Sequence, residues 1–322
     1  MAANRATAST NVIRRSGEYG RLVTRPIHKA ILMTRRALTL VELLVVLGTV
    51  MILAAMILPA VQSARSAARR MSCVNKMRQL LIAGVNHEAA FSRLPAGTAV
   101  GDINQPYHSW LVDLLPYLEL SAVSTEIANS YQTSKDPFNP TIHPYFSRSF
   151  GHFACSEDSR SGESQFVPRY DFSVGLTSYL GCNGRSANSK DGLLFADSSI
   201  RLRDITDGLS TTILFGERPP SFKFDYGWWY AGVGNGSGEL DHHVGTMSLD
   251  TSRFGRCFDL PYLFQTGTVT DECAASHFWS LHPGDGANFA FMDGSIRFFS
   301  YSSASVIVDL STRAGGEVAS AD

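Results

Sequence analysis

The sequence has little net charge, few cysteines and no motif of a nucleophilic enzyme. Its net charge is −1 and only 18% of its residues are charged, so the composition provides no electrostatic basis for binding nucleic acid. No serine or cysteine stands in a catalytic motif, and the alternating glycines from Gly232 to Gly238 lack the strand–helix context of a nucleotide-binding loop. We therefore expect no enzymatic activity and no nucleic-acid partner.

Charge is scarcest between Leu38 and Val61, where 24 residues carry one charged side chain, Glu42. A helix of this length crosses a bilayer core of about 30 Å at a rise of about 1.5 Å per residue. A carboxylate in such a segment costs roughly 2.5–3.5 kcal/mol on membrane-insertion scales. The segment therefore predicts a membrane-spanning helix in which Glu42 has a specific role.

The residues at the start of this segment resemble the signal of type IV prepilins and pseudopilins. That family has a basic leader, a small residue, a bulky apolar residue and then Thr-Leu-x-Glu; here RRA at 35–37 precedes LTLVE at 38–42. The resemblance implies that a prepilin peptidase cleaves between Ala37 and Leu38, removes residues 1–37 and methylates the new N-terminus of Leu38. Ala37 stands where the family most often has glycine.

Residues 1–36 carry eight Lys or Arg against a single Glu, which is typical of an unstructured leader that is removed. A compact leader also begins at Met33, so the sequence leaves the true start, Met1 or Met33, open. Lys and Arg near the membrane are balanced, with five in 19–36 and five in 65–78. The prepilin resemblance, not this balance, implies a single-pass protein of the cytoplasmic (inner) membrane with its N-terminus in the cytoplasm.

Glu42 is expected to pair with a neighbouring subunit. Cleavage would leave a cationic amine on Leu38, and pairing of this amine with Glu42 of another copy would offset the burial of both charges and set the axial register. Head-to-tail contacts between identical helices predict other pilin-like subunits as partners and an open filament. The alternative is that Glu42 lies near enough to the helix end to reach the lipid headgroups.

Two other interpretations of the apolar segment remain open. A secretory signal has an apolar core of about 7–15 residues and a small-x-small cleavage site, for which 66–68 would serve, but this segment is longer and contains Glu42. A plain signal anchor is the other. In that case the protein would be a single-pass ectodomain that binds a ligand or acts as an enzyme.

Residues 62–93 are expected to continue the helix as an amphipathic half that packs on the exported domain. Apolar residues fall at spacings that place them on one face: Ala67, Met71, Val74, Met77, Leu81 and Val85. Gly84 and LPAG at 94–97 indicate where the helix frays and ends. Residues 94–322, about 230 in number, suffice for one globular domain with a core.

Several pieces of the chain resemble a bacterial family, DUF1559, that combines a prepilin-type N-terminus with a C-terminal His-x9-Asp-Gly element. They are CVNKMRQLLIAGVNHEAAFSRLPAG from Cys73, SWLVDLLPYLEL from Ser109, HFACSED around Cys155, IRLRDITDGLSTTILFGE from Ile200, and HPGDGANFAFMDGSIRFF from His282. Ten residues, not nine, separate His282 from Asp293 here. The resemblance implies a pilin-like α+β fold, with the N-terminal helix packed on an antiparallel sheet.

The exported domain reads as α+β from its own patterns. Ser109 to Leu120 has helical spacing, and 121–149 is polar with three prolines and predicts a surface loop. Thr211 to Glu217 predicts a buried strand, and Trp228 to Tyr230 lies in a second expected strand.

The pair Asp293–Gly294 predicts a hairpin with a two-residue turn and positive φ at both turn positions. This turn would place Phe289, Phe291, Ile296 and Phe298 on one core face. His282 precedes the hairpin and is expected to hydrogen-bond the turn or a nearby backbone group. His282, Asn288 and Asp293 could alternatively form an acid–base or metal site, but the structural role explains the motif sufficiently, and we expect no metal and no cofactor.

The sequence also offers oxygen ligands for calcium. Asp204, Asp207 and Asp293 could supply the oxygens that Ca²⁺ binds, although aspartates of this kind also occur in turns. The five cysteines, four of them beyond residue 150, suit an exported domain. Cys257 can pair with Cys273 and Cys73 with Cys155, leaving Cys182; the sequence leaves this connectivity open.

Overall fold

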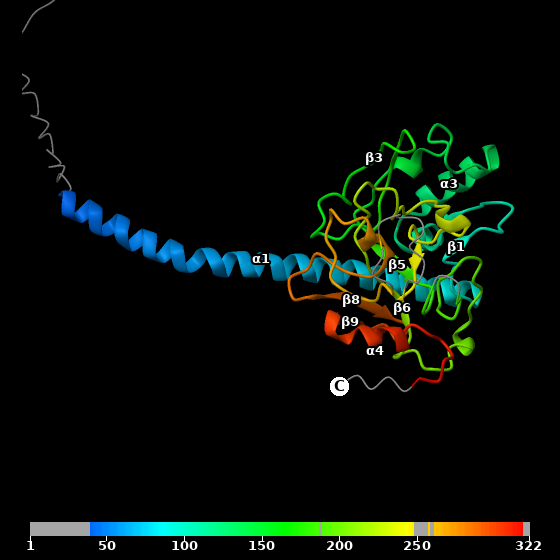
Figure 1. Ribbon diagram of the computed structural model, residues 1–322. Coiled ribbons are helices and arrows are strands. Elements are labelled where there is room, and N and C mark those ends of the chain that lie inside the picture. Colours follow the sequence, from blue (N-terminus) through cyan, green and yellow to red (C-terminus); the bar gives the residue numbers. More distant parts are fainter. Residues whose placement is uncertain (1–38, 187–188, 248–256, 258–260, 318–322) are drawn as a thin grey trace, which may run out of the picture. The chain divides into compact units, whose positions relative to one another are not determined.

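The computed structural model describes residues 39–186, 189–247, 257 and 261–317 (Figure 1). The leader 1–37 and the expected cleavage site between Ala37 and Leu38 lie outside these residues. The chain divides into two compact units, Met1–Ala55 and Met56–Asp322, which are described separately below.

The described part of the first unit is the start of helix α1 (Leu40–Phe91), a continuous helix of 52 residues. An 18-residue window of α1 has a mean hydropathy of 2.6, and none of that window is buried. By length and composition α1 can therefore cross a membrane, as the sequence predicts. Its large apolar side chains from Leu40 to Leu58 are exposed, which suits a lipid or protein environment better than water.

The second unit contains the rest of α1, whose inward face differs from the predicted one. The buried residues of α1 are Cys73, Met77, Leu80, Leu81, Ala83, Gly84 and His87, whereas Met71 and Val85 are exposed. Small residues let the helix approach the domain closely. A prediction of the buried face that counts only large apolar residues therefore overlooks Ala83 and Gly84. Gly84 lies inside the helix rather than at a fraying end, and the helix ends at Phe91, before Ser92 with a φ of +55°.

A five-stranded sheet forms the centre of the second unit, with strand order β7-β5-β6-β8-β9. Its strands are β5 (Tyr179–Cys182), β6 (Ile213–Glu217), β7 (His243–Val244), β8 (Gly286–Phe291) and β9 (Ile296–Ser300). All neighbours are antiparallel except β5 and β7. The predicted strand ending at Glu217 is confirmed, and all five of its residues are buried.

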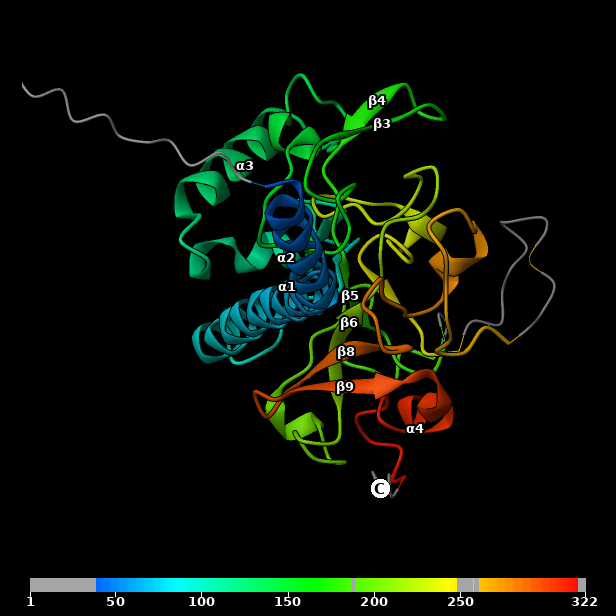
Figure 2. The same cartoon turned by 90° about the vertical axis from the view of Figure 1, so that its left-hand side faces the viewer.

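The sheet separates two hydrophobic cores. One core contains the inward face of α1, together with Trp110, Phe215 and Ala290. The other contains Phe289 and Phe291 with helix α4 (Ala304–Asp309). The C-terminal half of α1 and helix α4 therefore cover opposite faces of the sheet (Figures 1 and 2), and the fold is α+β with a long N-terminal helix, as predicted.

Short elements complete the domain. They are β1 (Thr98–Ala99) paired with β2 (His108–Ser109), α2 (Trp110–Leu114), α3 (Ser121–Thr133), β3 (Gln165–Val167) paired with β4 (Phe172–Val174), and 3-10 turns at Leu115–Tyr117, Pro144–Ser147, Leu202–Asp204, Gly234–Gly236, Cys273–Ser276 and Tyr301–Ser303.

Three predictions for this region need correction. The expected helix from Ser109 to Leu120 is divided into α2 and a 3-10 turn, Leu115–Tyr117, which has Pro116 near its start. The expected loop 121–149 begins with α3, which buries Ile127 and Tyr131. The segment Trp228 to Tyr230 is buried but forms no strand beyond an isolated bridge at Trp228.

The β8–β9 hairpin has a register one residue away from the predicted one. Ala290 pairs with Ile296, so the turn has three residues, 292–294. Of these only Gly294 has a positive φ, +92°, as in a type I turn followed by a glycine bulge. A shift of one residue moves every side chain of a strand to the opposite face of the sheet.

The corrected register changes which aromatic residues meet. Phe289 and Phe291 contact Phe299, with ring centroids 6.0 and 6.1 Å apart. Ile296 packs against the other core, and the ring of Phe298 lies 3.9 Å from the Arg70 guanidinium carbon. The predicted single core face made of Phe289, Phe291, Ile296 and Phe298 was therefore wrong.

Candidate functional site

A buried carboxylate, Glu217, is the centre of a hydrogen-bond network in the second unit. Its Oε1 lies 3.0 Å from Nε2 of His282. Its Oε2 accepts hydrogen bonds from the backbone N–H of Asn288 at 2.8 Å and from the Asn288 side-chain amide at 2.9 Å. The side chains of His282 and Glu217 are 0% and 2% exposed, so each depends on the other for its polar contacts.

The sheet and one loop bring these three residues together. Glu217 ends β6, and Asn288 lies in the adjacent strand β8, where the pairing of Gly216 with Phe289 places the two side by side. His282 stands in the loop before β8. Ser280 fixes this loop, because its Oγ accepts from the His282 N–H at 3.1 Å and donates to the Gly286 carbonyl at 2.7 Å.

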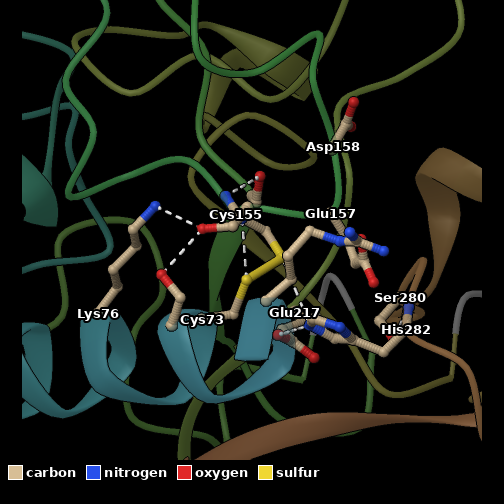
Figure 3. The surroundings of a disulfide bond; sticks show 12 residues. Cys73, Lys76, Cys155, Glu157, Asp158, Glu217, Ser280 and His282 are labelled. Carbon is tan, nitrogen blue, oxygen red and sulfur yellow. Dashed lines mark hydrogen bonds and ion pairs between the residues drawn. A yellow bond between two sulfur atoms is a disulfide. The ribbon is translucent and has the colours of Figure 1, made fainter. Parts of the chain in front are cut away.

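A disulfide between Cys73 of α1 and Cys155 lies directly beside this network (Figure 3). Cys155 Sγ is 3.4 Å from Nε2 of His282, and Cys73 Sγ accepts the backbone N–H of Ser156 at 3.0 Å. The two sulfur atoms, a carboxylate oxygen of Glu217 and a ring nitrogen of His282 all lie within 4.8 Å of one another, and all four residues are buried.

Polar contacts also tie the loop of Cys155 to α1. Lys76 donates to the carbonyl of Ala154 at 2.8 Å and to Ser156 Oγ at 3.1 Å, and burial lowers the pKa of Lys76. Arg69 forms an ion pair with Glu157. The disulfide is thus one of several bonds that join α1 to residues about eighty positions later in the chain.

Comparison with known proteins places most of this domain in one family. A family model described as a protein of unknown function (DUF1559) matches residues 62–305. The chain belongs to the DUF1559 family. No curated protein and no solved structure matches it.

The matched part of this DUF1559 member contains every residue of the network and the disulfide. Cys73, Cys155, Glu217, His282 and Asn288 all fall inside it. The residues that resemble a prepilin signal and Glu42 fall before its first residue, so the family match concerns the domain that follows the apolar segment and does not include the N-terminal signal.

The residues singled out in the C-terminal motif of this DUF1559 protein fall into two groups. His282 and Asn288 meet at Glu217, not at the hairpin turn. Asp293 stays at the turn, where it accepts from the Ser295 N–H at 2.9 Å and from Arg297 at 3.2 Å. Glu217 was not predicted as a site residue, although an acidic residue at the end of an apolar strand is a signal that the sequence contains.

The aspartates considered for calcium each have their own local donors. Asp204 accepts from the Arg201 N–H at 3.0 Å. Asp207 accepts from the N–H groups of Gly315 at 2.7 Å and Gly316 at 3.0 Å. Calcium binding by these residues stays a prediction.

The remaining cysteines have the pairing that the sequence left open. Cys257 and Cys273 form a second disulfide, and Cys182 is free and buried. Burial raises the pKa of the Cys182 thiol to about 12, so this thiol is unreactive at neutral pH.

Glu42, in the first unit, takes part in a capping box. Its Oε2 accepts the Thr39 N–H at 2.8 Å and the Thr39 hydroxyl at 2.9 Å, while its own N–H donates to Thr39 Oγ1 at 3.3 Å. These reciprocal bonds satisfy donors at the helix start. This local role of Glu42 is a finding of the structure and was not among the predictions from the sequence.

Proposed function

We propose that this DUF1559 protein is a pilin-like structural subunit, anchored by α1 and processed by a prepilin peptidase between Ala37 and Leu38. The observation that carries the proposal is the Glu42 carboxylate at the start of an exposed, apolar helix. Family membership and the single long apolar helix support it. The two disulfides support export of the domain, because disulfides persist in oxidising compartments.

The capping box does not use the whole carboxylate of Glu42. Both bonds from Thr39 reach Oε2, and in the described part of the chain Oε1 has no such bond. After cleavage at Leu38, a cationic amine would stand at the end of each helix. Pairing of that amine with Oε1 of a neighbouring copy would neutralise both charges in an apolar setting.

The capping box suggests a sharp test. Glu42→Gln removes the charge but keeps a side-chain oxygen that can cap Thr39, since glutamine also serves in capping boxes. Thr39→Ala is the matched control, because it removes the cap and keeps the charge. We expect Glu42→Gln to insert and to be cleaved, but to lose co-purification of tagged and untagged copies; Thr39→Ala should co-purify.

The N-terminus of the protein from native membranes gives the second measurement. Intact and peptide mass should show a chain that begins at Leu38 and carries one additional methyl group. A chain that still carries Arg35 and Arg36 would contradict the proposed processing. Normal co-assembly of Glu42→Gln would contradict the proposed charge pair.

A second candidate function is ligand binding by the exported domain. A cleft of about 620 Å³ is lined by Leu94, His108, Asp113, Tyr117 and Asp197 among others, which is within the usual size range of ligand sites. By contrast, the depression beside Cys155, Glu217 and Ser280 measures about 10 Å³, too small for an organic molecule. On this hypothesis the protein is a monomer in detergent, which sedimentation velocity distinguishes from co-assembly.

A further inference from the structure

The four side chains around the first disulfide form a set of metal ligands. Two cysteine sulfurs, an imidazole and a carboxylate are the donors that Zn²⁺ takes in four-coordinate sites. In this protein they are Cys73, Cys155, His282 and Glu217, with one donor atom of each within 4.8 Å of the others. They come from α1, a loop, β6 and the loop before β8, so the folded domain, not a local sequence motif, assembles the set.

The distances suit a tetrahedral ion. Bonds of about 2.3 Å to sulfur and about 2.0–2.2 Å to nitrogen and oxygen place neighbouring ligand atoms roughly 3.3–3.8 Å apart. Cys155 Sγ is 3.4 Å from His282 Nε2, and this nitrogen is 3.0 Å from Glu217 Oε1. All four ligand atoms lie within 4.8 Å of one another. The two sulfurs are bonded to each other, so they would have to separate on reduction before an ion could enter.

Outer contacts would stay in place around the metal. Asn288 holds Oε2 of Glu217 with two hydrogen bonds, which leaves Oε1 for the ion. The Ser156 N–H donates to Cys73 Sγ, a contact that stabilises a thiolate. Supporting hydrogen bonds of this kind orient metal ligands and tune their affinity.

A disulfide alone does not explain why His282 and Glu217 are buried beside Cys73 and Cys155. Its sulfurs are neutral and accept hydrogen bonds weakly, yet a fully buried histidine and a nearly fully buried glutamate lie against it. Nδ1 of His282 has no partner in the part of the chain that is described, so the network engages this side chain through Nε2 alone. That nitrogen faces both Glu217 and Cys155.

We propose that Cys73, Cys155, His282 and Glu217 bind one Zn²⁺ when the two cysteines are reduced, and that the metal-bound dithiol and the disulfide are alternative states of one site. Binding of Zn²⁺ to the dithiol releases the two thiol protons. A disulfide oxidant then returns the site to the state seen here. The Cys73–Cys155 S–S bond forms, the S–S bond of the oxidant breaks, two electrons pass to the oxidant, which leaves as two thiolates, and Zn²⁺ departs.

The second disulfide provides a matched control within the same chain. No comparable set of ligands surrounds Cys257 and Cys273 among the described residues. A Cys257→Ser/Cys273→Ser variant therefore keeps the proposed site and removes the only other disulfide found in that part of the chain. Cys73→Ser/Cys155→Ser removes the proposed site instead.

The test uses the full-length protein in detergent, freed of metal by a chelator. One sample stays oxidised, and another is reduced anaerobically with a phosphine. Each is titrated with Co²⁺, whose absorption reports tetrahedral geometry and thiolate ligation, and then with Zn²⁺. We expect the reduced protein and the Cys257→Ser/Cys273→Ser variant to bind one Co²⁺ per chain with thiolate charge-transfer bands, and Zn²⁺ to displace it.

The oxidised protein and the reduced Cys73→Ser/Cys155→Ser variant should show no such bands. Asn288→Ser should weaken binding by about 10-fold to 100-fold, the usual effect of losing an outer-shell contact, and Glu217→Gln should weaken it at least as much. The comparison of oxidised with reduced wild type needs no variant to fold. Absence of stoichiometric Co²⁺ binding by the reduced wild type, or equal binding by the oxidised wild type, would overturn the proposal.

Discussion

The regions around Glu42 and Glu217 each place one carboxylate in an apolar setting, but they satisfy it in opposite ways. Glu42 is exposed on α1 and bonds to Thr39, three residues away. Glu217 is buried and bonds to His282 and Asn288, 65 and 71 residues away. The first arrangement forms within a single helical turn, whereas the second needs strands β6 and β8 and the loop before β8. A local cap leaves a carboxylate free to meet another molecule, while a long-range network holds it inside the fold.

The two disulfides extend this contrast between local and long-range bonds, and their removal is expected to have the largest effect on the free energy of unfolding. Cys73–Cys155 closes a separation of 82 residues and Cys257–Cys273 one of 16. On the chain-entropy model their removal lowers the free energy of unfolding by about 4.5 and about 3 kcal/mol. Urea unfolding of the two double Cys→Ser variants, followed by tryptophan fluorescence, measures both. Equal losses would show that sequence separation does not govern the stabilisation.

Glu217→Ala is expected to have the next largest effect. It leaves His282 and Asn288 with buried polar atoms that have lost their partner, and we expect the free energy of unfolding to fall by about 3–4 kcal/mol. Glu42→Ala is the counterpart, and it should leave the urea transition of the domain after the apolar segment unchanged, because the hydrogen bonds of Glu42 to described residues all lie within the first turn of α1. A shift of that transition by Glu42→Ala would show that Glu42 does not have a purely local role.

A local pair of side chains in the second unit, His108 and Asp113, should show a smaller effect on stability, and this effect depends on pH. Burial by itself would lower the pKa of His108, but Asp113, 3.1 Å away, and the Gln105 carbonyl raise it to about 9. The protonated form therefore stabilises the fold fully below about pH 6.5, and this contribution is lost as the pH rises through about 9.

The rise of the His108 pKa from 6.5 to about 9 corresponds to about 3.5 kcal/mol at about 1.4 kcal/mol per pKa unit. Solvent screening of Asp113, whose side chain is 30% exposed, lowers the expected loss to about 2–3 kcal/mol. Thermal unfolding from about pH 6 to pH 10 measures it. Asp113→Asn should be less stable at the acid end and should flatten the curve. A wild-type Tm that rises over this range, with Asp113→Asn unaffected, would contradict the assignment.

The strongest local patterns were predicted correctly from the sequence, whereas arrangements that need several distant segments were not. The apolar run after Leu38 and the strand ending at Glu217 each follow from the properties of neighbouring residues. The β8–β9 register failed because Asp293 and Gly294 suit both a two-residue and a three-residue turn, and only packing against the second core selects the latter. Helix α3 was not predicted because its sequence is mostly polar and only two of its residues, Ile127 and Tyr131, are buried.

The candidate site shows the same limit. His282 and Asn288 stood out through their motif, but their common partner Glu217 belongs to a strand 65 or more residues earlier. Nothing in the spacing of His282 and Asp293 points to Glu217. The cysteine pairs are an intermediate case, because the sequence named both pairings without deciding between them and others.

The covalent bond at Cys73 also has a mechanical consequence. Tension applied through α1 from its N-terminal side reaches Cys73 before it reaches the buried positions from Met77 to His87. In the disulfide state, a pull on the anchor would therefore pass through a covalent bond into the loop of Cys155, and the packing of the last turns of α1 would be shielded from load. After reduction of Cys73–Cys155, the same force would act on the packing of these last turns, and α1 would detach from the sheet at a lower force.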